Sequence, residues 1–155
     1  MALFRTGRCG RVTVERLREE HLAGVADIEK ACFSEPWSES ALRLLLTDTA
    51  LGFVALADDG SVASYVGMMT VADEGQITNV ATHPDFQRQG YGSAALDGLL
   101  AFAAQNGIAE IFLEVRRSNE AARALYTSRG FESVGERKAF YRFPTEDAVI
   151  MKKCI

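Results

Sequence analysis

Residues that bind metals or form disulfides are scarce in this sequence of 155 residues. The cysteines are Cys9, Cys32 and Cys154, the histidines are His21 and His83, and the sequence has no C-x-x-C or H-E-x-x-H motif. Three scattered cysteines do not make a disulfide framework, and without clustered ligands the common zinc sites are excluded. We therefore expect no metal cofactor, and reduced thiols of the kind found in the cytoplasm.

Long apolar segments and an excess of basic charge are also missing. No apolar run approaches the ~20 residues of a membrane-spanning helix, and the basic segment Met1–Arg11 lacks the apolar centre of a signal peptide. The net charge is −4, whereas proteins that bind nucleic acid carry a basic stripe. The sequence predicts a cytoplasmic protein that binds neither membranes nor nucleic acid, with a loose tail over residues 1–11.

Length and composition favour one globular domain. Hydrophobic residues make up 48% of the chain and charged residues 25%, which is typical of globular proteins. A chain of about 150 residues buries roughly 68–70% of its unfolded surface and needs no disulfides or metal to fold. Repeats, low-complexity tracts and linkers rich in proline or serine are absent from the sequence. We expect a single domain over residues 12–155.

Hydrophobic periodicity predicts alternating strands and helices. The predicted order is β-α-α-β-β-β-α-β-α-β-β, and the unit from Gln76 to Val115 is a strand, a helix and a strand, which predicts a right-handed parallel crossover. Because its neighbours are hairpins, the sheet should be mixed, in an α/β fold with flanking helices. Strands are expected at 12–16, 51–57, 62–71, 76–82, 111–115, 131–135 and 148–152, and helices at 19–33, 38–46, 90–106 and 119–129.

A glycine-rich segment, Gln87–Ser93, lies between a predicted strand and a predicted helix. Gly90 and Gly92 let the backbone turn N–H groups outward, and the helix N-terminus adds free N–H groups and a positive dipole. With Arg88 as a charged contact, the segment suits a phosphate or pyrophosphate. A glycine-rich helix start without a ligand explains the segment as well. The spacing Gly90-x-Gly92-x-x-Ala95 also matches the dinucleotide fingerprint, but seven residues separate the strand from the first glycine, which makes that interpretation weaker.

Three residues of the following segment could carry chemistry. Glu114 lies near the carboxyl end of a strand, where ligands of parallel sheets bind, and could accept a proton. Asn119 and Tyr126 share one face of the next helix. Each also has a purely structural explanation: a solvated acid, a helix cap and a tyrosine at the edge of the core.

Two aromatic segments allow two interpretations. Trp37, after Pro36, could line a pocket or fill the core. Segment 137–141 mixes basic and aromatic residues, and it could bind a chain or nucleotide or form a solvated hairpin strand.

Together these segments resemble the GCN5-related N-acetyltransferase (GNAT) family, and within it the RimI-type ribosomal-protein alanine N-acetyltransferases. The resemblance covers about residues 12–153, which is nearly the whole chain. The matching segments are 79–81, 84–92, 113–116, 118–119, 124–126 and 130–131, with 36–38 and 146–148 nearer the two ends.

The resemblance implies acetyl-CoA as co-substrate. The loop at 88–93 would bind its pyrophosphate, and the backbone of residues 80–82 would pair with its pantetheine arm. Glu114 would be the general base and Tyr126 the general acid for the leaving thiolate. The implied cofactor-binding residues are Val80, Ala81, Thr82, Arg88, Gln89, Gly90, Tyr91, Gly92, Ser93, Asn119 and Tyr126.

The acceptor implied by the resemblance is a protein N-terminus, in this subfamily the N-terminal alanine of a small-subunit ribosomal protein, and the expected assembly is a monomer or a weak homodimer. An α-amine has a pKa of ~7.7–8.0 and is partly neutral at pH 7, whereas lysine at ~10.4 is almost fully charged, so one carboxylate is an adequate base for the former. The chain departs from the family at Thr82, His83 and Phe140. A small-molecule amine, a lysine side chain or a non-catalytic CoA-binding module are the alternatives.

Overall fold

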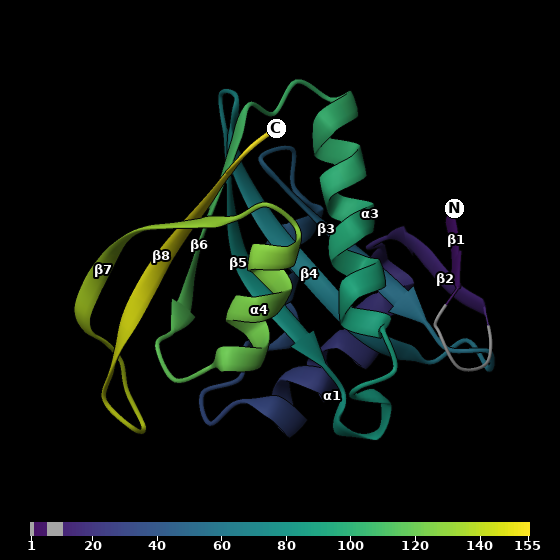
Figure 1. The fold of residues 1–155 in the computed structure, drawn as a ribbon. Coiled ribbons are helices and arrows are strands. Elements are labelled where there is room, and N and C mark those ends of the chain that lie inside the picture. The colour runs from purple at the N-terminus through teal and green to yellow at the C-terminus, as the bar shows by residue number, and fades with distance from the viewer. Residues whose placement is uncertain (1, 6–10) are drawn as a thin grey trace.

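The chain folds into one mixed sheet of eight strands in the order β1-β2-β3-β4-β5-β6-β8-β7 (Figure 1). The structure, a computed structural model, describes residues 2–5 and 11–155. The strands are β1 (Ala2–Arg5), β2 (Arg11–Arg16), β3 (Ala50–Leu56), β4 (Val62–Val71), β5 (Glu74–Thr82), β6 (Glu110–Arg116), β7 (Glu132–Tyr141) and β8 (Glu146–Cys154). The helices are α1 (Leu22–Cys32), α2 (Glu39–Leu42), α3 (Tyr91–Gln105) and α4 (Glu120–Ser128), with 3₁₀ turns at η1 (Glu19–His21), η2 (Arg43–Leu46) and η3 (Pro84–Phe86).

Both ends of the chain differ from the expectation. The predicted loose tail is wrong for Ala2–Arg5, which forms β1 and pairs antiparallel with β2; the hydrogen-bonding edge of β2 supplies the partners that order this segment. Residues 1 and 6–10 of the predicted tail lie outside the described residues. The strand predicted at 131–135 is longer than expected, because β7 stays paired with β8 as far as Tyr141↔Glu146.

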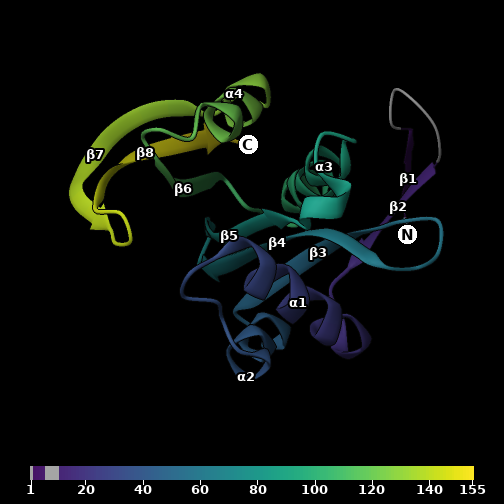
Figure 2. The same cartoon turned by 90° about the horizontal axis from the view of Figure 1, so that it is seen from below.

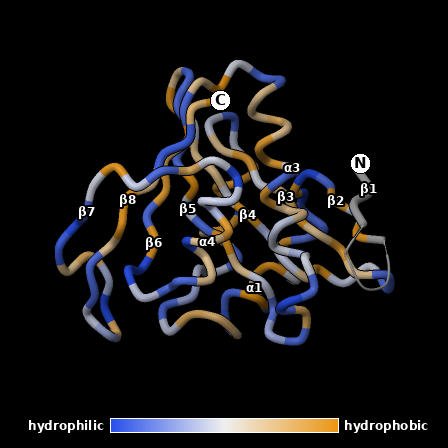
Figure 3. The backbone as a smooth tube through the Cα atoms, viewed as in Figure 1, coloured by the Kyte–Doolittle hydropathy of each residue, from blue (hydrophilic) through white to orange (hydrophobic). Residues whose placement is uncertain are grey.

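Helices flank the sheet, as predicted, and they cover both of its faces. In Figure 2, α1 and α2 lie on one face and α3 and α4 on the other. Each face has its own hydrophobic core, one around α3 and Tyr126 and the other around α1 and Trp37. Apolar residues are concentrated in α3 and along the central strands (Figure 3). Among the described residues, no helix is both long and apolar enough to cross a membrane.

The seam between β5 and β6 decides the shape of the sheet. These strands are parallel, as the crossover predicts, but only three residue pairs join them: Glu74↔Glu110, Gly75↔Ile111 and Gln76↔Phe112. Beyond Gln76, β5 stays with β4, while β6 continues along β8. Figure 1 shows the two strands diverging from this short seam.

A bulge in β5 lies where the divergence begins. The β4–β5 register runs from Gly67↔Asn79 to Met68↔Ile77, so Thr78 is the extra residue on β5. A bulge of this kind bends its strand and increases its twist. It therefore turns the second half of β5 away from the course of β6.

Candidate functional site

The diverging strands open a cleft of about 490 Å³. Its walls come from four places in the sequence: the segment before α2, the bulged part of β5, the middle of β6 and the end of β7. The lining residues are Trp37, Gln76, Ile77, Thr78, Glu114, Arg137, Phe140 and Tyr141. Trp37 thus has both of its predicted roles, because it lines the cleft and also packs against the core around α1.

Glu114 enters this cleft because of the alternation of β6. Ile111, Leu113 and Val115 are buried in the core around α3, so the intervening positions face the opposite side of the strand. The Glu114 side chain is only 20% exposed, and its Oε1 lies 3.1 Å from Nε of Arg137 on β7. A partly desolvated carboxylate in a cleft can accept a proton from a bound group.

Of the two tyrosines near Glu114, Tyr141 lines the cleft, whereas Tyr126 on α4 is buried in the core around α3 and is not among the residues that line the cleft. Burial, together with the nearby Glu114 carboxylate, raises the pKa of Tyr141 to about 12. Burial, with a smaller contribution from Tyr141, also raises the pKa of Tyr126. The Tyr126 ring packs edge-on against Phe131, with 5.8 Å between centroids. Both hydroxyls therefore keep their protons at neutral pH and are proton donors.

The loop before α3 has the backbone of an anion site. Arg88 and Gly90 both have left-handed conformations, with φ of 62° and 87°, and Gly90 is the N-cap of α3. Left-handed backbone is uncommon for an arginine and turns successive N–H groups into a concave cradle. Gln89 donates from Nε2 to the Asp85 carbonyl, and Tyr91 packs edge-on against Phe86. The N–H groups in the first turn of α3, which includes Ser93, have no acceptor within the helix.

Gly92 allows a close approach between α3 and the end of β5. A Cβ atom at position 92 would lie 3.0 Å from Oγ1 of Thr82 and 3.7 Å from Oγ of Ser64. The Thr82 hydroxyl donates to Ser64, and the Ser64 hydroxyl donates to the Ala81 carbonyl. Thr82, a departure from the family pattern, is therefore bonded to β4 and faces the start of α3.

The remaining predicted residues lie on both sides of the divergence. Val80, Ala81 and Thr82 belong to the part of β5 beyond its last pair with β6, so no described strand pairs with this edge. The Thr82 carbonyl accepts from Sγ of Cys32 and Nε2 of Gln87, and a ligand backbone would have to share or replace these contacts. Asn119 is the N-cap of α4, and its Oδ1 accepts from the Ala122 N–H. The structure thus shows the capping role of Asn119, which occupies its carbonyl oxygen.

A buried carboxylate, which the sequence analysis missed, connects the walls of the cleft. Glu29 on α1 is 1% exposed. It accepts hydrogen bonds from the Tyr65 hydroxyl, from Nδ2 of Asn79 at 3.1 Å and from the Trp37 backbone N–H at 3.4 Å. Oδ1 of Asn79 is buried and has no partner within the described part of the chain. Glu29 thereby links Trp37 to the bulged half of β5.

A sequence signal for Glu29 exists. Leu22, Val25, Ala26 and Glu29 occupy positions i, i+3, i+4 and i+7 of α1, which form one face of a helix. An acid at a core position of an apolar stripe indicates a buried carboxylate with partners, because an unpaired one is strongly unfavourable.

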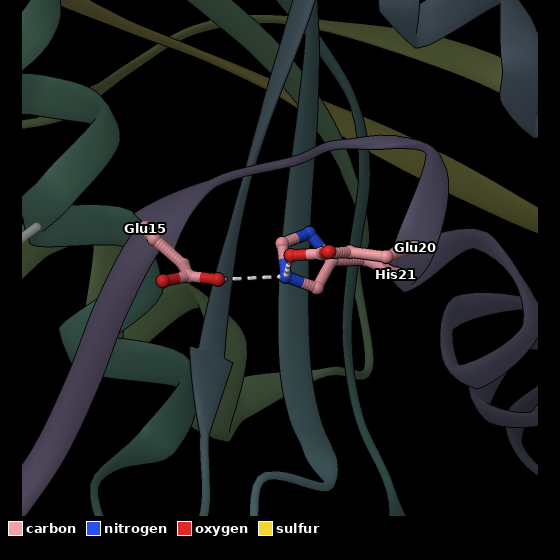
Figure 4. A group of neighbouring side chains, drawn as sticks. All are labelled: Glu15, Glu20 and His21. Carbon is pink, nitrogen blue, oxygen red and sulfur yellow. Dashed lines mark hydrogen bonds and ion pairs between the residues drawn. The ribbon is translucent and has the colours of Figure 1, made fainter.

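A second group of ionisable side chains lies away from the cleft, at the end of β2 and on η1. Glu15, Glu20 and His21 are close enough together to hold an ion (Figure 4). However, Nδ1 of His21 accepts from the Arg18 backbone N–H at 3.0 Å, so Nε2 carries the proton and donates to Glu15 at 2.8 Å. Since both ring nitrogens are engaged, this group serves to cap the turn.

Comparison with known proteins places this site in a family. The Acetyltransferase (GNAT) family model matches residues 22–131, from the start of α1 through the anion loop, Glu114 and Tyr126. The chain belongs to the GNAT acetyltransferase family. The resemblance of the sequence to this family is thereby confirmed.

Individual relatives cover nearly the whole chain. The [ribosomal protein bS18]-alanine N-acetyltransferase of Escherichia coli is 38% identical over 90% of this chain and 95% of its own length. The N-alpha-acetyltransferase RimI of Mycobacterium tuberculosis is 32% identical over 92% of both proteins. The crystal structure of the ribosomal-protein-S18-alanine N-acetyltransferase from Escherichia coli superposes with a TM-score of 0.87 at 36% identity, covering 93% of this chain and 94% of that chain. The predicted GNAT fold is therefore confirmed as well.

The bonds to Glu29 predict the effect of removing one donor. Tyr65→Phe leaves the buried carboxylate one donor short, and a hydrogen bond to a charged group contributes about 1.5–3 kcal/mol. We expect the free energy of unfolding, measured by urea titration, to fall by that amount. Tyr91→Phe removes a hydroxyl outside this network and should change it by less than about 0.5 kcal/mol. Equal effects of the two variants would contradict the assigned role of Glu29.

Proposed function

We propose that this GNAT protein transfers the acetyl group of acetyl-CoA to the α-amine of a protein N-terminus, and that its acceptor is the N-terminal alanine of a ribosomal protein. The observation that carries the proposal is the Glu114 carboxylate in the cleft between β5 and β6, with Tyr126 on the neighbouring helix. The names of the relatives at 32–38% identity support the same reaction. We place the reaction in the cytoplasm, with the enzyme as a monomer or a weak homodimer.

The described backbone fits acetyl-CoA. The first turn of α3 and the left-handed residues Arg88 and Gly90 offer N–H groups to a pyrophosphate, and the Arg88 guanidinium adds charge. The open edge of β5 at Val80–Thr82 offers backbone groups to the amides of the pantetheine arm, which would join the sheet as a strand does. When bound, the co-substrate supplies an acetyl group activated as a thioester.

The side chains divide the proton transfers between them. Glu114, directly or through a water molecule, accepts the proton that the amine loses. Tyr126, whose pKa is raised by burial, retains its proton and donates it to the departing thiolate sulfur. The two groups come from adjacent elements, β6 and α4, so a proton is removed on the acceptor side and delivered on the thiol side.

The chemistry of the acceptor favours an α-amine. At pH 7 the ratio of neutral to protonated amine is lower for a lysine than for an α-amine by a factor of roughly 250–500, because the two pKa values differ by about 2.4–2.7 units. Among the described cleft-lining residues, Glu114 is the one carboxylate, which suits an acceptor that is already partly neutral.

The acceptor itself is tested with three amines. We expect acetylation of a peptide that begins with alanine, and a kcat/KM at least tenfold lower for the same peptide with a blocked N-terminus and an internal lysine, or for a polyamine. The measurement is thiol release with mass-spectrometric location of the acetyl group. Preferential acetylation of the lysine or the polyamine would refute the proposed acceptor, and no acetylation of any amine would indicate a CoA-binding module.

The anion loop is tested by adding a side chain where the backbone is left-handed. Gly90→Val introduces a Cβ-branched residue at a φ of 87°, which distorts the cradle. We expect at least a tenfold loss of acetyl-CoA affinity in calorimetry, and a similar loss for Gly92→Val, whose side chain would meet Thr82. Gly60→Val, at the same φ in the β3–β4 turn, is the matched control and should leave the affinity unchanged. Wild-type affinity in the position-90 and position-92 variants would refute the loop, and tighter binding of NADH than of acetyl-CoA by the wild type would favour the dinucleotide interpretation.

The catalytic pair is tested by the pH dependence of kcat with the alanine peptide. Glu114→Gln should lower kcat by roughly 10²–10⁴-fold, the usual contribution of a general base, and high pH should partly restore it because more amine is then neutral. Tyr126→Phe should also slow turnover, with acetyl-CoA affinity within a few-fold, and high pH should not restore it because the missing group is a proton donor. Near-wild-type turnover in both variants would reduce Glu114 and Tyr126 to structural roles.

A further inference from the structure

Arg137 lies beside the proposed base, Glu114, in the cleft between β5 and β6, which is the acceptor cleft of the proposed reaction. Nε of Arg137 lies 3.1 Å from Oε1 of Glu114, and the guanidinium carbon lies 5.6 Å from the centroid of the Phe140 ring. Both Arg137 and Phe140 line the cleft. The Arg137 side chain is 57% exposed, so solvent can reach this cation and a ligand that enters the cleft meets it.

The charges that face Glu114 are few. Among the described lining residues, Arg137 is the one cation and Tyr141 the one other ionisable group, while the lining residues from β5 and the segment before α2 are uncharged. The neighbouring charged residues have partners of their own. Arg116 binds the Pro144 and Arg142 carbonyls and Glu146, and its guanidinium carbon lies 4.5 Å from the centroid of the Tyr141 ring, so it is the next cation beside the cleft. Glu136 pairs with Arg117, and Lys138 pairs with Glu136 and Asp147.

A lone carboxylate would be a poor partner for an acceptor amine. It would attract the ammonium form and stabilise it, which raises the pKa of the bound amine and keeps the lone pair protonated. A cation beside the carboxylate offsets this attraction. The bound amine then keeps a pKa close to its value in solution, and the neutral, nucleophilic form is not placed at a disadvantage.

We propose that Arg137 is a specificity-determining residue that makes the acceptor cleft favour the free-amine form of the N-terminus over its ammonium form. The inference rests on the proposed function, since it concerns the acceptor of that same site. In this proposal the positive charge of Arg137 offsets the attraction of Glu114 for an ammonium group. The competing explanation is that Arg137 only holds the Glu114 carboxylate in place through the contact from Nε.

Two peptide probes separate charge from shape. One is the alanine acceptor peptide with a trimethylated N-terminus, a permanent cation of the ammonium type; the other carries a hydroxyl group in place of the α-amine and is neutral. Their affinities are measured by calorimetry with CoA present, for the wild type and for the variants Arg137→Gln, Arg137→Lys and Lys138→Gln. Lys138→Gln is the matched control, because it removes the same charge from the adjacent position of β7, outside the cleft lining.

We expect Arg137→Gln to bind the trimethylated peptide about tenfold more tightly than the wild type does, the equivalent of one pKa unit, with little change for the hydroxyl peptide. Arg137→Lys and Lys138→Gln should keep the wild-type preference. The gain in Arg137→Gln should shrink in 1 M salt, where the Debye length falls to about 3 Å from about 10 Å at 0.1 M.

The pH dependence of the affinity for the alanine peptide, measured by calorimetry with CoA present, gives a readout that a positioning role would not produce. In Arg137→Gln the amine in the complex should lose its proton about one pH unit higher than in the wild type, so the affinity gained over the wild type should be present at neutral pH and disappear at alkaline pH, where the amine is neutral. A role in placing Glu114 would lower kcat, most at neutral pH as in Glu114→Gln, without shifting the pKa of the bound amine.

Each outcome decides the matter. Equal changes for both probes, or an unchanged pKa of the bound amine, would overturn the charge role of Arg137 while leaving the proposed acceptor intact. If the wild type neither acetylates the alanine peptide nor binds either probe, the proposed function fails, and the inference falls with it. A shift in probe preference together with acetylation of the peptide would support both.

Discussion

The architecture depends on how early the parallel pairing of β5 and β6 ends. Only three residue pairs join the strands, and each strand then satisfies its backbone on its other side, β5 against β4 and β6 against β8. Hydrogen bonds that a continuous parallel sheet would make internally are thus left for a ligand. The bulge at Thr78 maintains this divergence, and the cleft, the open edge at Val80–Thr82 and the inward position of Glu114 all follow from it.

The divergence is stabilised on the α1 side by buried polar contacts. Glu29 accepts hydrogen bonds from Tyr65 on β4, from Asn79 on β5 and from the backbone N–H of Trp37. One carboxylate therefore binds both Trp37, which lines the cleft, and β5, the strand beside the proposed cofactor site. Because a buried charge is tolerated only with such partners, this network couples the position of Trp37 to the course of β5. The anion loop is coupled to β4 in a similar way, through the bonded hydroxyls of Thr82 and Ser64 beneath Gly92.

The site contains few ionisable groups, and each has a different role. Glu114 suits proton acceptance, Tyr126 and Tyr141 keep their protons because burial raises their pKa values, and Arg137 balances the carboxylate that the acceptor meets. The pair of Glu114 and Arg137 is only partly desolvated, so it is suited to rearrange when a ligand enters, whereas Glu29 is enclosed and suited to a fixed structural role.

Local patterns in the sequence determined the order of the elements and the family. The helix predicted at 90–106 and the strand predicted at 111–115 depend on near neighbours, and the structure bears them out as α3 and β6. The pairing of Ala2–Arg5, the length of β7, the hydrogen-bond partners of Glu29 and the meeting of Glu114 with Arg137 were decided only by the tertiary structure. Glu114 and Arg137 are 23 positions apart in the chain, and their contact exists because β8 lies between β6 and β7 and brings both strands to one cleft. Periodicity records which face of a strand is buried, but it carries no information about which strand lies beside it.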